Sequence, residues 1–316
     1  METRELGRSG LKAPLMGVGA MTWGDPAAIP RFNPARLAYG LTGSRDDQFE
    51  ALVTCIEAGA GLVDSAAIYG KGESERRVGE LAAGRDVLVA TKFPSRFIAS
   101  ADSLPRDLEA SLARLKRGTI DLYQVHFPSW RSIPRTMKHM ADAVKAGKVR
   151  AVGVSNFSAA QMRLAHAALA DRGIALASNQ VQYSLLHRQP ETDGVLDACR
   201  ELGVTLIAYM PLASGALTGK YSVEKPPLGF RRRTSNFRAE GMKALVPVLN
   251  LLGETGRKHA KTPAQVALRW LIEKGALPIP GARNREQAGH NAGALTFTLS
   301  KAELDALDAA TAGWRG

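Results

Sequence analysis

The sequence of 316 residues predicts an α/β fold in which eight parallel strands, separated by helices, close into a (β/α)8 TIM barrel. Two patterns predict this fold. Short apolar or β-branched runs recur along the chain, and a polar break and an amphipathic helix follow each of them. The runs are almost continuously apolar, which is typical of parallel strands that are covered on both faces.

A closed barrel fits the count of eight strands better than an open sheet does, although the pattern alone leaves the open form possible. No G-x-G-x-x-G follows a strand, so the usual phosphate loop of a Rossmann sheet is missing. Barrels of this length often form one domain, and we predict a single domain over residues 1–316.

The expected strands follow one another along the chain with turn residues at their ends. They are 14–20, 61–66, 86–92, 120–127, 149–156, 177–183, 204–210 and 276–281.

Several of the intervening helices have recognisable starts, and Gly59 is placed to end the first of them. A residue whose side chain can cap the free backbone N–H groups precedes each of these helices. The starts are Ser44, Ser103 with Pro105, Thr262 with Pro263, and Ser300 with Glu303 as a capping box.

The composition is that of a globular protein, with 45% hydrophobic and 23% charged residues. No apolar run approaches the roughly 20 residues of a spanning helix, and the N-terminus lacks the apolar stretch of a signal peptide. We therefore expect a cytoplasmic protein without a membrane partner. Cys55 and Cys199 stand at helical spacing among apolar residues, which favours buried thiols over a disulfide or a catalytic cysteine.

The chain carries 42 basic and 30 acidic residues, a net charge of +12 that raises the question of nucleic-acid binding. The basic residues are scattered, and the run Arg231 to Arg233 has no interleaved aromatic residues. We therefore predict no nucleic-acid partner, but a surface that uses some of its cations for phosphate groups.

Polar residues stand at the carboxyl ends of the expected strands, which meet at one mouth of a barrel, where barrel enzymes place their chemistry. These residues are Asp64, Lys92, His126, Ser155, Asn156, Gln180 and Tyr209.

Tyr69, five residues after Asp64, adds a proton donor to this set. A free tyrosine has a pKa of about 10, and a nearby lysine ammonium stabilises its phenolate. An aspartate next to the lysine holds the ammonium in place, and a histidine can hydrogen-bond a substrate oxygen. The set suits proton delivery to a carbonyl oxygen that gains negative charge.

Lys92 also fits a Schiff-base aldolase, because the lysines that form Schiff bases occur at strand ends of barrels. Such a lysine needs a desolvated amine without a partner acid, whereas Asp64 is expected to keep Lys92 charged.

Nine motifs, in order and over nearly the whole chain, resemble those of the aldo-keto reductase family. Among them are DSAAIYGKGESERRVGE, ATKF, DLYQVHFP, GVSNF, NQVQYSLLHR and AYMPLASGALTGKY. The N-terminal RELGRSGLKAPLMGVG resembles the β-hairpin that precedes strand one in that family. The resemblance implies a catalytic tetrad of Asp64, Tyr69, Lys92 and His126. We expect no metal site.

The resemblance also implies a nicotinamide cofactor, usually NADPH (NADP+), across the mouth. Ser155, Asn156 and Gln180 would bind its carboxamide, and Tyr209 would stack on its ring. Met210, Pro211, Leu212, Ser214, Gly215, Leu217 and Lys220 would follow the pyrophosphate. Arg283, Gln287 and Asn291 would hold the 2'-phosphate and adenine, and Ala20, Met21 and Gly281 complete the expected cofactor site. Two positions depart from the family pattern. Met210 replaces a common serine, which removes one polar contact with the phosphates, and His290 stands where the family often has a glutamate near the adenine.

Two segments without clear periodicity, 24–44 and 221–238, are expected to lie over the mouth. In relatives the second one folds over the cofactor, so that an arginine of 231–233 would meet its phosphates. Trp23, Phe93, Phe127 and Trp130 lie near strand ends and are expected to line an apolar substrate pocket.

The resemblance thus predicts NADPH-dependent reduction of an aldehyde or ketone, with the proton coming from Tyr69. The alternative is a cofactor-binding regulatory subunit that resembles the β-subunits of potassium channels. The sequence leaves the carbonyl substrate and the oligomeric state open.

Overall fold

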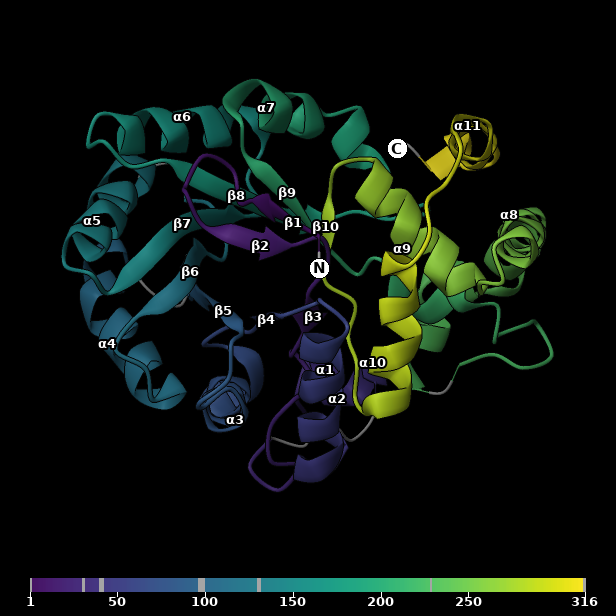
Figure 1. The fold of residues 1–316 in the computed structure, drawn as a ribbon, viewed down its shortest axis with the longest axis horizontal. Coiled ribbons are helices and arrows are strands. Elements are labelled where there is room, and N and C mark those ends of the chain that lie inside the picture. Colours follow the sequence, from purple (N-terminus) through teal and green to yellow (C-terminus); the bar gives the residue numbers. More distant parts are fainter. Residues whose placement is uncertain are drawn as a thin grey trace.

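In the computed structural model, a parallel eight-stranded sheet forms the centre of the molecule, and helices surround it (Figure 1). The structure describes residues 2–29, 32–39, 43–95, 100–129, 132–227 and 229–314. The eight strands follow each other round the sheet in chain order, from β3 to β10.

Each expected strand is present, and most are shorter than expected because only part of each apolar run is paired. The strands are β3 (Val18–Gly19), β4 (Leu62–Asp64), β5 (Leu88–Phe93), β6 (Ile120–Val125), β7 (Val149–Ser155), β8 (Leu176–Gln182), β9 (Thr205–Tyr209) and β10 (Leu277–Pro278).

The first and last strands meet, which closes the sheet into a barrel. Gly19 forms a parallel bridge with Gly281, and its backbone N–H donates to the Pro280 oxygen at 3.0 Å. A Cβ atom on Gly19 would lie 3.0 Å from the Ile279 oxygen, so the close approach of the two strands favours glycine there. The prediction of a (β/α)8 barrel is confirmed, and the open sheet is excluded.

An antiparallel hairpin of β1 (Thr3–Glu5) and β2 (Lys12–Pro14) covers the amino-terminal end of the barrel, as expected (Figure 1). Leu6 and Leu11 of its turn are buried in one apolar cluster with Leu62 and Leu122 of the barrel. The Gly7 N–H donates to the Thr205 hydroxyl at the first residue of β9. The hairpin thus closes the end that lies opposite the predicted site.

The capping residues begin most of the helices as predicted. Ser44, Thr262 and Ser300 each accept a hydrogen bond from the third residue of their helix within a capping box. Ser103 differs, because a 3-10 turn, η2 (Ala101–Ser103), runs directly into the helix and gives Ser103 helical backbone angles. Its hydroxyl donates instead to the Ser100 oxygen.

The helices lie outside the sheet, with α8 and α11 in a further outer position (Figure 1). They are α1 (Pro34–Tyr39), α2 (Arg45–Glu57), α3 (Glu73–Leu81), α4 (Leu104–Leu115), α5 (Ile133–Lys145), α6 (Ala159–Ala170), α7 (Val195–Leu202), α8 (Ala239–Lys258), α9 (Pro263–Glu273), α10 (Arg285–Ala292) and α11 (Lys301–Ala310).

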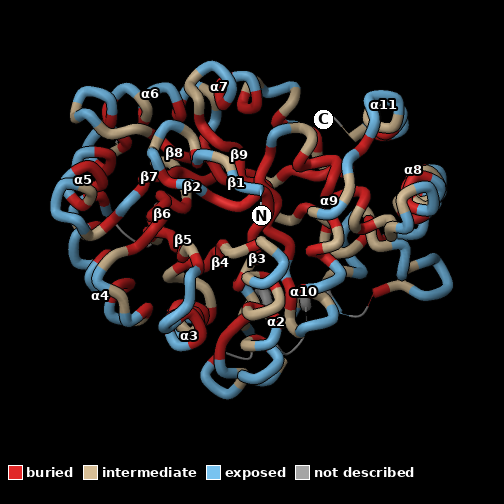
Figure 2. Tube along the Cα trace, in the orientation of Figure 1, coloured by how far each residue is buried: buried red, intermediate tan, exposed pale blue. Residues whose placement is uncertain are grey.

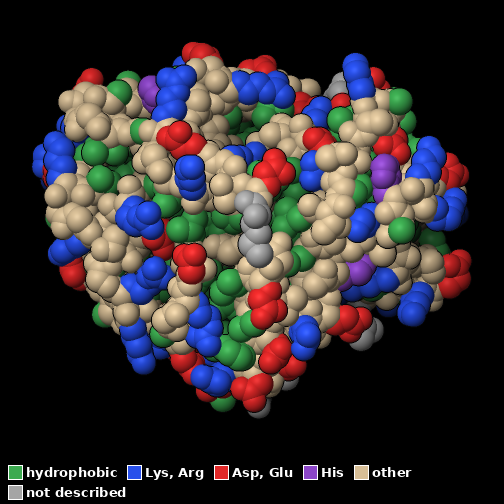
Figure 3. Space-filling view, in the orientation of Figure 1, with side chains coloured by type: hydrophobic (Ala, Val, Ile, Leu, Met, Phe, Trp, Pro, Cys, Tyr) green, Lys and Arg blue, Asp and Glu red, His purple; other side chains and the backbone are tan. Residues whose placement is uncertain are grey.

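Burial follows this layering, with buried strands inside and half-exposed helices outside (Figure 2). Basic and acidic side chains are interspersed on the face that carries the N-terminus (Figure 3). Cys55 and Cys199 are buried free thiols, and burial raises the pKa of each to about 12, far from that of a reactive thiolate. Within the described ranges, no helix is both long enough and apolar enough to cross a membrane.

The two segments without sequence periodicity contain short helical turns in the structure. Segment 24–44 includes α1, and segment 221–238 includes the 3-10 turns η6 (Gly229–Arg233) and η7 (Ser235–Phe237). The segments touch, because the Arg231 guanidinium donates through Nε to the Ala38 oxygen at 3.0 Å.

Candidate active site

A buried ion pair lies at the carboxyl ends of two neighbouring strands. Lys92 on β5 donates through Nζ to Asp64 Oδ2 of β4 at 2.5 Å and to the Ser65 oxygen at 2.8 Å. Both side chains are almost completely buried, at 0% and 4% exposure. Burial lowers the pKa of Lys92, but the Asp64 carboxylate and then Tyr69 raise it, and the pKa ends above its ordinary value. Lys92 is therefore an ammonium and not the neutral amine that a Schiff base requires.

Tyr69 stands above this pair on the turn η1 (Tyr69–Gly72), which follows β4. Gly70 and Lys71 have positive φ angles of 56° and 58°, which turn the chain sharply after the tyrosine. Its hydroxyl lies 3.5 Å from Lys92 Nζ. Burial raises the pKa of Tyr69 more than Lys92 lowers it, and Asp64 adds to the rise. The tyrosine is thus held protonated, rather than with the lowered pKa that the lysine alone would give.

His126 comes directly after β6 and faces Tyr69 edge to face, with ring centroids 5.9 Å apart. Burial and then the charge of Lys92 lower the pKa of His126 to about 3, so the imidazole is neutral at physiological pH. Within the described part of the chain, its buried Nδ1 has no hydrogen-bond partner. A neutral imidazole can therefore serve as a hydrogen-bond donor beside Tyr69 without carrying charge.

The second oxygen of Asp64 accepts from two glutamines inside the barrel. Gln180 of β8 donates to Oδ1 at 2.9 Å, and Gln124 of β6 donates at 3.1 Å. Gln124 was not among the predicted site residues. Its position two residues before His126, on the same face of the strand as the apolar Ile120 and Leu122, is the signal that would have found it.

The predicted carboxamide-binding residues lie next to one another and next to the tetrad. Asn156 Nδ2 donates to the His126 oxygen at 3.0 Å and to Ser155 Oγ at 3.1 Å. The Tyr209 hydroxyl donates to Asn156 Oδ1 at 3.0 Å, and the Ser155 hydroxyl donates to the backbone oxygen of Gln180 at 2.8 Å. Asn156 adopts a positive φ of 60° to make these contacts.

The segment after β9 has an unusual backbone. Met210, Ala213, Ser214 and Gly215 all have positive φ angles, between 48° and 96°, within and just before the turn η5 (Ala213–Thr218). Such a backbone forms concave surfaces where N–H groups can approach an anion. Pro211 and Leu217 are buried under the turn, Leu212 is half-buried, and Lys220 is exposed at its end.

Arg231 of η6 closes over this turn. Its guanidinium donates through Nη1 to the Ser214 oxygen at 3.0 Å and lies 5.6 Å from the ring of Tyr221. Arg232, by contrast, is exposed. Of these two arginines, the one that reaches the predicted pyrophosphate segment is therefore Arg231.

The predicted adenine end lies around the start of α10. Asn284 caps this helix by accepting from the Gln287 N–H, and Gln287 Oε1 accepts from the Arg283 N–H at 3.1 Å. Asn291 is buried and donates to the oxygen of Gly281 at 3.2 Å, so it stabilises the strand end itself. Arg283 is half-buried in the loop that precedes a helix N-terminus, which is a favourable position for binding a phosphate. Ala20 is buried after β3, next to the exposed Met21.

With this geometry in place, comparison with known proteins identifies the family. The sequence profile of the Aldo/keto reductase family matches residues 15–312. The chain belongs to the aldo/keto reductase family. It is 36% identical over 308 residues to the chloroplastic pyridoxal reductase of Arabidopsis thaliana. The aligned region covers 91% of this chain and 80% of that protein.

Solved aldo-keto reductase structures have the same fold. The glycerol dehydrogenase of Gluconobacter oxydans aligns with a TM-score of 0.82 and 25% identity, over 98% of this chain and 95% of that one. An aldo-keto reductase from Klebsiella pneumoniae in complex with NADPH aligns with a TM-score of 0.74 and 27% identity, over the same shares. The protein is accordingly an NAD(P)H-dependent oxidoreductase of carbonyl compounds.

The aromatic residues predicted to line the substrate pocket of this aldo-keto reductase differ in position. Phe127 is half-buried and stacks on His126, with ring centroids 4.5 Å apart. Trp23 and Phe93 are buried, at 0% and 1% exposure, and the Trp23 indole N–H donates to the Ala282 oxygen. Both side chains belong to the apolar core. Trp130 lies outside the described residues.

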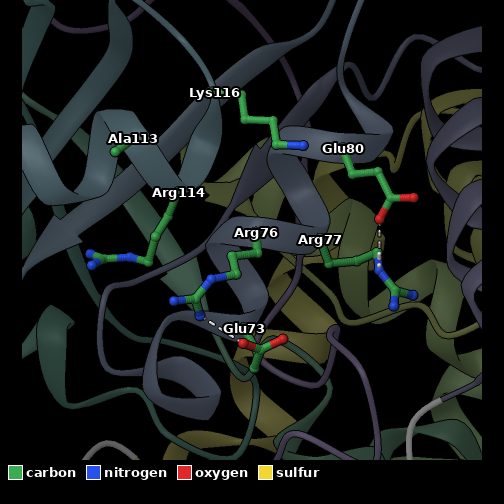
Figure 4. Close-up of a pocket in the computed structure, with 7 residues that line it drawn as sticks. All are labelled: Glu73, Arg76, Arg77, Glu80, Ala113, Arg114 and Lys116. Atoms are coloured by element: carbon green, nitrogen blue, oxygen red, sulfur yellow. Dashed lines mark hydrogen bonds and ion pairs between the residues drawn. The ribbon is translucent and has the colours of Figure 1, made fainter.

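A surface groove of about 380 Å³ between α3 and α4 is separate from the reductase site (Figure 4). Charged side chains line it, but Arg76 pairs with Glu73 and Arg77 with Glu80, as the dashed lines in Figure 4 mark. Arg114, also at the groove, pairs with the buried Glu75. Because neighbouring acids already pair these arginines, the groove does not compete with the barrel mouth as the site of chemistry.

Proposed function

We propose that the protein reduces an aldehyde or ketone to an alcohol with NADPH, and that Tyr69 donates the proton. The observation that carries the proposal is the buried pair of Lys92 and Asp64 directly beneath the Tyr69 hydroxyl. Such a pair has a structural cost, because two charges are removed from water. The position of this costly ion pair under a tyrosine at the barrel mouth supports acid catalysis there.

Each side chain of the tetrad has its own role in the proposed reaction. A bound nicotinamide supplies the hydride. Tyr69 holds its proton because burial raises its pKa, and it gives the proton to the carbonyl oxygen as that oxygen gains negative charge. Lys92 stabilises the resulting phenolate, and Asp64 keeps Lys92 charged and in place. His126 is neutral and orients the carbonyl oxygen by a hydrogen bond.

The residues around the mouth fit a nicotinamide dinucleotide. The ring face of Tyr209, the polar groups of Ser155, Asn156 and Gln180, and the positive-φ turn η5 would hold the nicotinamide half and the pyrophosphate. Arg283 favours NADPH over NADH, because a guanidinium can bind the 2'-phosphate through two hydrogen bonds. The NADPH complex of the Klebsiella pneumoniae relative supports the same choice.

Residues 1–316 would act as one domain in this reaction, with segments 24–44 and 221–238 as covers of the mouth. The hydrogen bond between Arg231 and Ala38 supports this arrangement, since it joins the two segments. Phe127 beside His126 offers an apolar surface to the substrate. Pyridoxal is a sensible first substrate, because the Arabidopsis thaliana relative is a pyridoxal reductase.

The test is NADPH oxidation, followed at its absorbance band, against a panel of aromatic, sugar and keto aldehydes and pyridoxal. Parallel assays with NADH measure cofactor preference. We expect turnover of at least one carbonyl class and a higher kcat/KM for NADPH. Failure to bind either nicotinamide cofactor would overturn the proposal.

A further inference from the structure

We propose that Gln124 is a positioning residue that fixes the orientation of the carboxamide-binding Gln180 beside Asp64 of the tetrad. The inference deepens the proposed function and rests on it. Gln124 lies on β6, is 0% exposed, and projects into the barrel beneath the mouth. Its amide contacts both Asp64 and Gln180, which come from two other strands.

The hydrogen bonds determine which way each amide faces. Asp64 Oδ1 can only accept, and Gln124 and Gln180 each donate to it through Nε2. Gln180 Nε2 also lies 3.3 Å from Gln124 Oε1, which accepts from it. The nitrogen of Gln180 is therefore directed inward by two acceptors. Its oxygen remains to accept from the carboxamide NH2 group of a nicotinamide.

Without Gln124, the Gln180 amide would lose one of these two acceptors. Its nitrogen and oxygen could then exchange places at a lower cost, because only Asp64 would distinguish them. A reversed amide would direct its nitrogen toward the carboxamide and its oxygen toward the Asp64 carboxylate. Gln124 therefore selects the orientation of Gln180 that suits the cofactor.

Gly153 on β7 supports this role independently. A Cβ atom at Gly153 would lie 2.9 Å from Gln124 Cγ and would also meet the hydroxyl of Ser178. The absence of a side chain there thus leaves the space through which Gln124 crosses the barrel. Ser178 is buried beside Gly153, and within the described residues its hydroxyl has no hydrogen-bond partner. Ser178→Ala therefore removes a buried polar group without breaking a hydrogen bond, and it serves as the matched control for Gln124→Met.

The test measures the dissociation constant of NADPH by fluorescence titration of the full chain, without turnover. We expect Gln124→Met to raise this constant about tenfold, the factor that corresponds to the loss of one hydrogen bond between the Gln180 amide and the carboxamide of the cofactor. Ser178→Ala is expected to leave it unchanged. In a Gln180→Met background, Gln124→Met is expected to change it less than about twofold, because the two residues act as one unit.

A general loosening of the barrel would act in both backgrounds, so equal effects of Gln124→Met with and without Gln180 would overturn the inference. An unchanged dissociation constant in folded Gln124→Met would do the same. If Gln124→Met does not fold, Gly153→Ala in the Ser178→Ala background displaces Gln124 instead. That double variant is expected to bind NADPH more weakly than Ser178→Ala, and equal binding would overturn the inference. If the wild-type protein bound no NADPH, the proposed function would fail together with this inference.

Discussion

Tyr69 carries the proton in the proposed reaction, and removal of its hydroxyl group should affect proton transfer without affecting cofactor binding. Tyr69→Phe keeps the ring and its contact with His126 but removes the proton. We expect a loss of kcat of at least about 10³-fold, with NADPH affinity within about twofold of wild type. Stopped-flow reduction and cofactor titration measure the two effects separately. Retained turnover in this variant would contradict the assigned role.

His126 adds a pH dependence to stability, because its pKa falls from 6.5 to about 3 in the folded protein. An unfolded chain binds a proton at His126 below about pH 6.5, whereas the folded chain does so only near pH 3. The contribution of a neutral His126 is therefore present above pH 6.5 and is lost as the pH falls toward 3.

We accordingly expect the free energy of unfolding of wild type to fall more steeply between pH 6.5 and 4 than that of His126→Asn. Urea unfolding at a series of pH values measures both slopes. Parallel slopes would show that the folded histidine titrates normally. The pH profile of reductase activity should show no change near pH 6.5 that arises from the titration of His126.

The 3-10 turn η6 illustrates what a short element contributes. Arg231 joins α1, through the Ala38 oxygen, to the turn η5, through the Ser214 oxygen. One guanidinium thus connects α1, η5 and η6, three segments from different parts of the chain, and lysine cannot reproduce its planar set of donors.

Arg231→Ala is therefore expected to weaken NADPH binding about tenfold, and Arg231→Lys to recover little of the loss. Arg232→Ala is the matched control, because Arg232 has the same charge and is exposed, and it should change affinity less than about twofold. Isothermal titration at constant ionic strength compares the three variants. A larger effect at Arg232 than at Arg231 would contradict this reading of the turn.

For the whole barrel, we expect changes in the hairpin at the amino-terminal end to affect stability without affecting the site at the carboxyl end. Leu6 is completely buried in the apolar cluster that closes the lower barrel. We expect Leu6→Ala to lower the free energy of unfolding by about 2–5 kcal/mol, the usual cost of a large-to-small core substitution. NADPH affinity should stay within about twofold, and a large loss of affinity would show that the two ends are coupled. Chemical denaturation and cofactor titration on the same preparation test this.

Local sequence patterns were sufficient for the order of elements and for the strand ends. Eight apolar runs and their helix caps depend on neighbouring residues, so periodicity and capping chemistry predicted them. The strand-end rule also predicted that Asp64, Lys92 and His126 would converge, and the structure brings them together. The predicted cap of α4 at Ser103 was wrong, because the preceding 3-10 turn continues into the helix.

Contacts between distant segments determined the pKa values and the hydrogen-bond partners of the site residues. The direction of the Tyr69 pKa depends on burial, which no local pattern reports, and it reversed the simple expectation from a neighbouring lysine. Gln124 acquires its partners only when β4, β6 and β8 face one interior, and Arg231 differs from Arg232 only because α1 and η5 lie beside it. A sequence specifies which chemical groups are available at each strand end. Closure of the barrel sets their distances and their exposure to water, and these set their charges.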